Sequence, residues 1–418
     1  MKKNDLAVII LAAGKSTRMK SILPKAAHLL CSRPLINYVL DLAKSLKPAK
    51  TAVVLGYGYA QVAQLLPEAV LRVKQKKLLG TADAVKEGMR ALKGFTGTVL
   101  VLYADNPLLK EKTLKDLIKY HQDNDCAVTL LTADMDKPQG YGRILRDKYS
   151  CICGIVEEKD ADDFQKNIKE INTGIMCFKA KDLARSLAKV RPNNKKKEYY
   201  LTDVIGIIYK NARLTGNIKT SDVNEALGVN SRIELAKANK IMQARINEEV
   251  MKKGVTIISP DTTFISYGAK IGQDSVIYPF TVIEKSVKIG KHCSVGPCSH
   301  LREGTIIGNN VVVGNFVESV RSSIKSGTFV KHFSYLGDAS LGQNVNIGAG
   351  TVIANFDGKN KHNTTIGKNA FIGSDSVLVS PVTIGNSART GAGSVVVKTK
   401  VPSGKTVVGV PAKLLKKR

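Results

Sequence analysis

The chain has no tryptophan, and aromatic residues make up only 6% of its 418 residues. Large rings therefore cannot fill its core, and small or β-branched aliphatic residues must do so instead. Hydrophobic residues still reach 43%, a share that is typical of a globular protein. Because the chain is longer than one core usually supports, we expect two domains.

Long apolar runs and metal-type cysteine spacings are also missing. No run reaches the ~18 apolar residues that a membrane span needs, so we expect no membrane association. The seven cysteines are an odd number without zinc-site spacing, and Cys151 and Cys153 lie in a predicted strand. Reduced, packed thiols of this kind indicate a cytoplasmic protein.

Acidic residues are scarce. Asp and Glu number 35 against 64 Lys and Arg, which gives a formal charge of +29. This excess favours anionic partners, either nucleic acid or phosphorylated metabolites. The lysines are spread along the chain without a zinc-finger or RNA-recognition motif, so we expect no nucleic-acid partner.

The first 230 residues alternate short apolar runs with helical patterns. We expect strands at 6–11, 51–55, 98–103 and 127–131, and helices at 35–46 and 82–92. Apolar strands separated by helices predict a parallel sheet covered on both faces, which is a doubly wound, Rossmann-like α/β domain. Its ligands would bind at the carboxyl ends of the strands.

A long helix is expected next, at 231–254. Ser231 and Glu234 form a capping-box pattern, and Gly254 can end the helix. We interpret this helix as a linker arm between a first domain at 1–230 and a second domain at 255–418.

Beyond Gly254 an aliphatic residue recurs at every sixth position. This period predicts a parallel β-helix of hexapeptide repeats, whose coils each point one aliphatic per face inward. The hexads break between Val313 and Tyr335 and at a polar loop, 357–363, and such insertions often carry function. A purely structural solenoid remains the alternative. The uninterrupted hexads are marked by Ile265, Ile271, Ile277, Ile283, Ile289, Val295, Leu301, Ile307 and Val313.

A phosphate-binding loop is predicted after the first strand. It reads Leu11-Ala12-Ala13-Gly14-Lys15-Ser16-Thr17-Arg18-Met19 and is followed by Leu23-Pro24-Lys25. Small residues let the backbone approach a nucleotide, and backbone N–H groups favour phosphate. The loop has neither the dinucleotide fingerprint nor a Walker motif.

Together with motifs farther along the chain, this loop resembles the signature of the sugar nucleotidyltransferase family. With the hexads included, the resemblance covers nearly the whole chain and is to the bifunctional uridylyltransferase and acetyltransferase family, with its left-handed β-helix. The further motifs are Gln75 with Leu79-Gly80-Thr81, then Leu102-Tyr103-Ala104-Asp105, Gly140-Tyr141-Gly142-Arg143-Ile144, Ile155-Val156-Glu157, Glu170-Ile171-Asn172-Thr173-Gly174 and Glu198-Tyr199-Tyr200-Leu201-Thr202-Asp203.

The resemblance implies the residues of a uridylyl-transfer site. Asp105 and Asn230 would hold Mg²⁺, while Arg18 would neutralise the leaving pyrophosphate and Lys25 the reacting phosphates. Ala104 departs from the family, which usually has Gly there. The uridine nucleotide and its sugar would be bound by Leu11, Ala12, Ala13, Gly14, Lys25, Gln75, Gly80, Thr81, Tyr103, Gly140, Glu157, Asn172 and Asn230.

The chemistry of this transfer needs no protein nucleophile, because the sugar phosphate can attack the α-phosphorus of UTP directly. Catalysis then consists of positioning and charge stabilisation. One carboxylate and one amide leave coordination positions for water and phosphate oxygens, as Mg²⁺ prefers. The alternative for Asp105 is a helix cap at a strand end.

For the β-helix the resemblance implies an acetyltransferase in which His332 is the general base. The sugar phosphate would be bound by Arg302, Tyr335, Asn346 and Lys361, and acetyl-CoA by Ala349, Asn355, Phe356, Ser374 and Ala392. Three positions depart from the family: Val320 and Gly409 replace a Lys and an Arg, and Phe356 replaces a Tyr. The family also implies a homotrimer.

We therefore expect acetylation of glucosamine-1-phosphate by acetyl-CoA, then uridylyl transfer from UTP to give UDP-N-acetylglucosamine, a cell-wall and lipopolysaccharide precursor. One alternative is a uridylyltransferase whose β-helix acylates a different amino-sugar phosphate or is inactive. Another is a nucleic-acid-binding protein, whose affinity would fall steeply with salt.

Overall fold

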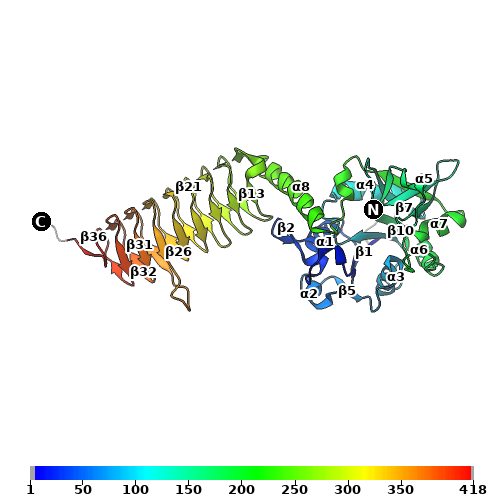
Figure 1. Ribbon diagram of the computed structural model, residues 1–418, viewed down its shortest axis with the longest axis horizontal. Coiled ribbons are helices and arrows are strands. Elements are labelled where there is room, and N and C mark those ends of the chain that lie inside the picture. Colours follow the sequence, from blue (N-terminus) through cyan, green and yellow to red (C-terminus); the bar gives the residue numbers. More distant parts are fainter. Residues whose placement is uncertain (1–4, 416–418) are drawn as a thin grey trace. The chain divides into compact units, whose positions relative to one another are not determined.

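The computed structural model describes residues 5–415, and the chain divides into two compact units, Met1–Asn239 and Lys240–Arg418 (Figure 1). Each unit has its own apolar core. Among the described residues, no helix combines the length and apolar character required to span a membrane.

A mixed β-sheet forms the centre of the first unit, and it contains all four strands expected from the sequence. Along the sheet the strand order is β11-β7-β10-β6-β1-β4-β5. The strands are β1 Leu6–Ala12, β4 Lys50–Leu55, β5 Leu71–Lys74, β6 Thr98–Tyr103, β7 Val128–Asp134, β10 Glu170–Lys179 and β11 Thr215–Lys219.

The expectation of a wholly parallel sheet is wrong, because three strands of the sheet make only antiparallel pairs. β10 runs antiparallel to both β6 and β7. Between β7 and β10 the chain forms an antiparallel hairpin, β8 (Gly142–Arg146) and β9 (Ile152–Val156), and only a four-residue helix, α5 (Asp163–Lys166). Without a crossover helix the chain cannot return to the edge from which β7 started, so β10 enters in the opposite direction.

Helices cover both faces of this sheet, as a doubly wound domain requires. Val8 and Ile10 of β1 pack in one apolar cluster with α1 (Leu35–Ser45) and α4 (Glu111–Asp123). Ile9, which points to the other face, packs with α3, α6 and α7. These helices span Thr81–Ala91, Ala180–Leu187 and Asp203–Lys210.

The second unit is a parallel β-helix of short strands stacked in three sheets (Figure 1). Each strand except the last four pairs in parallel with the third strand after it, for example Val282↔His300 and Lys288↔Ile306. The predicted hexads are confirmed, because Ile277, Ile283 and Val295 are fully buried in its core. The first two sheets begin at β12 (Thr256–Ile257) and β13 (Phe264–Ile265).

The break predicted between Val313 and Tyr335 is not an insertion. The coils continue there through β21 (Val312–Asn315), β22 (Glu318–Val320), β23 (Ser323–Ile324), β24 (Phe329–His332) and β25 (Tyr335–Gly337). Ser319 takes the inward position, and the following hexad has five residues, so the phase shifts. The inward residue is therefore Leu336, which is fully buried, and not Tyr335.

The polar loop at 357–363 is a true excursion from the β-helix. Residues paired across the loop, such as Asn346↔Phe371, are farther apart in sequence than residues paired in earlier coils, such as Val276↔Ser294. Phe356 and Lys361 form an antiparallel bridge at its base.

The expected helix is α8, Arg232–Met251. The Ser231 hydroxyl accepts a hydrogen bond from the Glu234 N–H (3.2 Å), as a capping box requires. The Glu234 carboxylate, however, accepts a hydrogen bond from the N–H of Asn230 (2.8 Å), the residue before the N-cap, and not from the N-cap residue Ser231 itself.

Candidate active sites

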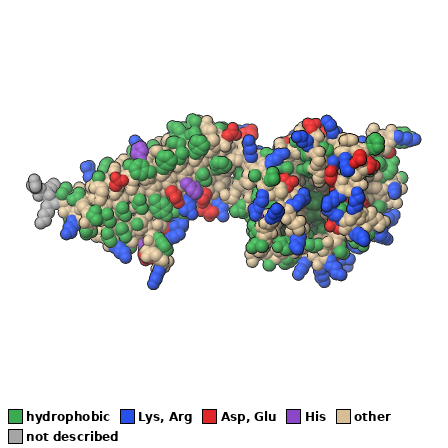
Figure 2. Space-filling view, viewed as in Figure 1, with side chains coloured by type: hydrophobic (Ala, Val, Ile, Leu, Met, Phe, Trp, Pro, Cys, Tyr) green, Lys and Arg blue, Asp and Glu red, His purple; other side chains and the backbone are tan. Residues whose placement is uncertain are grey.

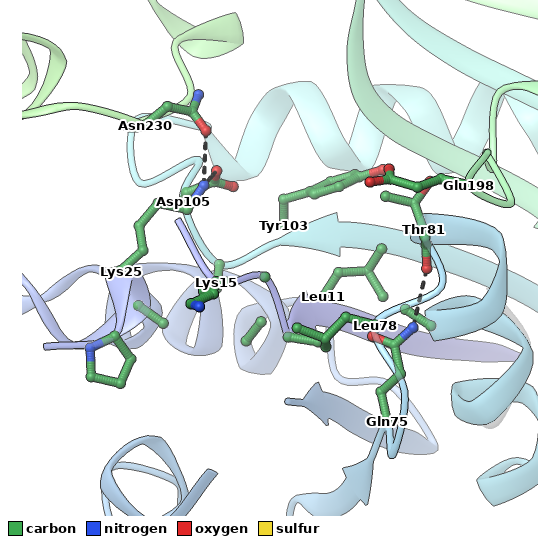
Figure 3. A pocket seen from close by; sticks show the side chains of 18 residues that line it. Leu11, Lys15, Lys25, Gln75, Leu78, Thr81, Tyr103, Asp105, Glu198 and Asn230 are labelled. Carbon is green, nitrogen blue, oxygen red and sulfur yellow. Dashed lines mark hydrogen bonds and ion pairs between the residues drawn. The ribbon is translucent and has the colours of Figure 1, made fainter. Parts of the chain in front are cut away.

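A cavity in the first unit lies at the carboxyl ends of β1 and β6 (Figure 3). The end of β1, the loop after it, the start of α3 and the end of β6 all contribute to its wall. Figure 2 shows Lys and Arg side chains around the hollowed face of this unit. The lining residues are Leu11, Ala12, Ala13, Gly14, Lys15, Pro24, Lys25, Ala26, Gln75, Leu78, Gly80, Thr81, Ala84, Tyr103, Ala104, Asp105, Glu198 and Asn230.

The backbone around Gly80 is fixed against a distant segment. Gly80 has φ +122°, and a Cβ there would lie 2.4 Å from the carbonyl oxygen of Tyr199. The Thr81 hydroxyl accepts a hydrogen bond from the N–H of Leu201 (2.9 Å). The Gln75 amide donates to the Gly80 carbonyl (3.2 Å) and to Asp83 (2.8 Å). Only glycine fits this close approach, which holds the start of α3 open toward the cavity.

Lys25 points between Asp105 and Asn230 (Figure 3). Its ammonium group forms an ion pair with the Asp105 carboxylate and donates to the Asn230 side-chain oxygen at 2.9 Å. The Val229 N–H donates to the Asp105 carbonyl (2.9 Å), which joins the two segments. A carboxylate and an amide oxygen therefore converge on one cationic group.

This pair of oxygens fits the preferences of Mg²⁺. The ion is usually held by one or two protein carboxylates and completes its shell with phosphate oxygens and water. Within residues 5–415 no group of three or more His, Cys, Asp or Glu side chains could hold a metal ion. A metal ion bound here would therefore need further ligands from the phosphate oxygens of the substrate and from water.

A second cavity adjoins the first and shares Tyr103, Asp105 and Asn230 with it. Arg18 lies here and not in the first cavity. The predicted sugar ligands Gly140, Glu157 and Asn172 are all brought together in its lining. The remaining lining residues are Asn106, Gln139, Tyr141, Gly142, Thr173, Gly174, Ala226, Gly228 and Glu234.

Burial shapes the electrostatics of this second cavity. It raises the pKa of Glu157, whose carboxylate accepts a hydrogen bond from the Thr202 hydroxyl (3.2 Å). Burial, with Glu157 and Asp105 nearby, also raises the pKa of Tyr103, so the phenol stays protonated. Asn172 accepts from the N–H of Gly174 (3.0 Å), which fixes its amide. These groups form a pre-oriented set of donors and acceptors.

Some lining residues were not singled out from the sequence as ligands. Glu198 and Tyr141 stand inside the quoted motifs, and Lys15 stands in the phosphate loop, so a signal existed for these three. Leu78 and Gln139 lie outside every motif. Only the fold brings them to the cavities.

In the β-helix, His332 ends β24 with an exposed side chain, in register with Asn315 of the preceding coil. Tyr335 is in register with Glu318, and the Arg302 guanidinium donates to the Glu318 carboxylate at 2.8 Å. Asn346 lies on the His332 side, between Phe329 and Phe371. Lys361 is exposed on the polar loop.

Three residues predicted to bind acetyl-CoA stack at one corner of successive coils. The Asp375 N–H donates to the Ala349 carbonyl (2.7 Å), and the Gly393 N–H donates to the Ser374 carbonyl (2.8 Å). Ala349, Ser374 and Ala392 thereby form a column. Phe356 is exposed on the loop, and Asn355 is buried, donating to Asp338 instead of joining this column.

The departures from the family pattern have distinct surroundings. Val320 is only 4% exposed, although the inward position of β22 belongs to Ser319 and Val320 is not part of the β-helix core. The adjacent Arg321 is exposed, and its guanidinium donates to both Asp338 oxygens (2.6 and 2.7 Å). Gly409 has φ +93°, a backbone conformation that disfavours arginine.

Two family models match the two units separately. Residues 8–196 match the MobA-like NTP transferase domain, and residues 268–303, 286–318 and 363–398 match the bacterial transferase hexapeptide of six repeats. A solved UDP-glucose pyrophosphorylase complexed with UDP-glucose covers 57% of this chain and 98% of its own, with 19% identity and a TM-score of 0.49.

Two curated relatives extend over nearly the whole chain. "Bifunctional protein GlmU" of Enterococcus faecalis is 42% identical over 90% of this chain and 89% of its own length. The protein of the same name from Thermosipho africanus is 44% identical over 94% of this chain and 92% of its own. Because the similarity spans both units, the chain belongs to the bifunctional GlmU family.

Proposed function

We propose that the chain makes UDP-N-acetylglucosamine in two transfer reactions, one in each unit. Glucosamine-1-phosphate is first N-acetylated by acetyl-CoA on the β-helix. The product then receives a uridylyl group from UTP in the first unit, and pyrophosphate leaves. The observation that carries this proposal is the convergence of Lys25, Asp105 and Asn230 where the nucleotide cavity meets the sugar cavity.

In uridylyl transfer, the protein positions charges and supplies no nucleophile. The cavity lined by Gln75, Gly80 and Thr81 binds the uridine, and Glu157 and Asn172 bind the sugar. Asp105 and Asn230 would hold Mg²⁺, which would supply positive charge to neutralise the phosphates. Lys25 neutralises the charge of the reacting phosphates with its ammonium group, and Arg18 stabilises the leaving pyrophosphate.

Acetyl transfer requires a base, because the sugar amine must lose a proton as it attacks the thioester carbon. His332 accepts this proton, and the thiol of coenzyme A leaves. Arg302, Tyr335, Asn346 and Lys361 bind the sugar phosphate. The coenzyme runs along the corner column of Ala349, Ser374 and Ala392, with Asn355 and Phe356 nearby, and a backbone N–H near Ala349 stabilises the developing oxyanion.

The active form is a cytoplasmic homotrimer in this proposal. A β-helix with short strands and flat faces is suited to side-by-side packing, and exposed apolar residues such as Phe264, Phe316 and Phe371 on its surface agree with such packing. Size-exclusion chromatography with light scattering should give three times the mass of 45.2 kDa. A monomer at micromolar concentration would contradict the trimer.

Separate assays of the two half-reactions test the proposal. Purified protein should release thiol when it is given acetyl-CoA and glucosamine-1-phosphate. It should release pyrophosphate when it is given UTP, N-acetylglucosamine-1-phosphate and Mg²⁺. Absence of pyrophosphate release would refute the first activity. Thiol release only with a different amino-sugar phosphate would favour that compound as the acetyl acceptor. The buried Val320, in place of the family's Lys, is the reason for testing this alternative.

A further inference from the structure

Arg143 is a buried arginine that neither proposed transfer reaction uses. It lies near the start of β8, and its side chain is 1% exposed. A guanidinium in the protein interior is costly unless its charge and its N–H groups are matched. The second cavity of the first unit, here called the sugar cavity, is lined by Tyr141 and Gly142 but not by Arg143. Any influence of this arginine on a bound sugar must therefore act through its neighbours.

The backbone of Arg143 lies between the strands that lead to two predicted sugar ligands. Arg143 is in register with Val156 of β9 and with Ile171 of β10. The next residues along the chain, Glu157 and Asn172, line the sugar cavity. Arg143 therefore belongs to the framework that carries both ligands.

The Arg143 guanidinium fastens three segments to one another. It donates hydrogen bonds to the carbonyl oxygen of Tyr141 and to that of Lys166 (3.3 Å). Its Nη2 also forms an ion pair with the Glu158 carboxylate, 2.7 Å from Oε2. Tyr141 precedes β8, Glu158 follows β9, and Lys166 ends α5. Because each contact ends on a different segment, loss of the fork would loosen these segments relative to one another.

We propose that Arg143 is a positioning residue for the sugar phosphate, because its guanidinium holds loop 140–142 and segment 157–158 in place at the wall of the sugar cavity. The Tyr141 carbonyl that it fixes lies next to Gly140 in the chain, and Glu158 adjoins Glu157. The described lining of the nucleotide cavity includes no residue of 140–142 or 157–158. The inference rests on the proposed uridylyl transfer, and it predicts an effect on the sugar phosphate and not on UTP.

Arg143→Lys tests this role, because lysine keeps the positive charge but replaces the fork with a single ammonium group. Pyrophosphate release is measured with the full chain at saturating Mg²⁺, while UTP and N-acetylglucosamine-1-phosphate are varied in turn. We expect the KM for the sugar phosphate to rise about 10-fold or more and the KM for UTP to change by less than about 2-fold. A general loss of structure would not separate the two substrates in this way.

Glu158→Gln provides a second variant, which decides the question if Arg143→Lys does not fold. It nearly preserves the size of the side chain but removes the negative charge beside the guanidinium. We expect the KM for the sugar phosphate to rise about 3-fold or more, with the KM for UTP again unchanged. Near-UV circular dichroism and Tm show whether each variant is folded.

Arg146→Lys is the matched control on the same strand. The Arg146 guanidinium donates to the Glu170 carboxylate (2.9 Å) and to the Ser150 carbonyl (2.7 Å), and neither of these residues lines the sugar cavity. Both KM values should stay unchanged in this variant.

The outcomes separate this inference from the proposed function. A wild-type chain that releases no pyrophosphate would refute the uridylyl transfer itself. With an active wild type, the role of Arg143 is overturned if the folded variants keep a normal KM for the sugar phosphate or raise both KM values equally. An equal rise of the sugar-phosphate KM in Arg146→Lys would overturn it as well.

Discussion

At the scale of single residues, Lys25 lines the nucleotide cavity and contacts Asp105 and Asn230, which the two cavities of the first unit share. These are the two residues that would hold a metal ion. Charge-assisted hydrogen bonds contribute about 1.5–3 kcal/mol. We therefore expect any contribution of Lys25 to uridylyl transfer to depend on its charge and on the length of its side chain.

Lys25→Met should lower kcat/KM for pyrophosphate release by roughly 10- to 150-fold, the change that corresponds to one lost charge-assisted contact. Methionine keeps most of the side-chain length but not the charge. Steady-state assays with saturating Mg²⁺ measure the effect. Lys44→Met, on the exposed side of α1, is the control and should retain full activity. A Lys25→Met enzyme with normal kcat/KM would rule out a role for this ammonium group.

Asp203 provides a prediction about pH. Burial and the neighbouring Asp160 raise its pKa to about 6, above its ordinary value of 3.8. Between these values the folded state binds more protons than the unfolded state, so stability falls as pH rises through this window. In urea denaturation, Asp203→Asn should gain about 1–2 kcal/mol relative to the wild type between pH 4 and pH 7, after allowance for solvent screening. The exposed Asp123→Asn should show no such gain. An Asp203→Asn difference that is independent of pH would contradict the raised pKa.

Val320→Lys is expected to damage the β-helix and not to improve substrate binding. Val320 is 4% exposed, and placing an ammonium group in the protein interior is costly. The variant should have a lower Tm and no lower KM for glucosamine-1-phosphate. Thermal denaturation and thiol-release assays measure both quantities. A 10-fold fall in KM would instead show that this position faces the sugar phosphate.

At the scale of elements, substitutions of two neighbouring residues test which of them points into the core of the β-helix. Leu336 is fully buried in its core, whereas Tyr335 is half-buried outside it. Leu336→Ala should destabilise the second unit by about 2–5 kcal/mol. Tyr335→Ala should cost about 1 kcal/mol or less. If chemical denaturation showed the larger loss for Tyr335→Ala, the inward position would be misassigned.

The elements also show how far sequence patterns reach. Buried strands and hexads are periodic and local, so β1, β6 and the early coils were predictable within a residue or two. The direction of β10 was not, because it depends on the β8–β9 hairpin and not on apolar spacing. Similarly, the coil that continues through Ser319 was not predictable, because a polar residue at an inward position breaks the pattern that defines a hexad.

The residues of the candidate sites also divide into those that sequence motifs predict and those that only the fold brings together. Lys25, Asp105 and Gly80 belong to compact motifs, and the fold brings them to one cavity. Leu78 and Gln139 reach the cavities from segments without a motif. Asn355 matches the family pattern, but its contact with Asp338 depends on the stacking of separate coils, which the sequence alone does not specify.

At the scale of the whole molecule, the two candidate transfer sites are built from separate sets of residues. The nucleotide and sugar cavities use residues of unit Met1–Asn239, and His332 belongs to unit Lys240–Arg418. Each unit has its own apolar core, so each site depends on the packing of its own unit. The two activities are therefore expected to be separable.

The most direct measurement assays both half-reactions in Asp105→Ala and in His332→Ala. Asp105→Ala should abolish Mg²⁺-dependent pyrophosphate release and leave thiol release unchanged. His332→Ala should lower thiol release by ~10²–10⁴-fold, the usual effect of losing a general base, and leave pyrophosphate release unchanged. His292→Ala, at another exposed histidine of the β-helix, is the control for the second variant. Loss of both activities in either folded variant, or of neither activity in both variants, would contradict an enzyme with two independent transfer sites.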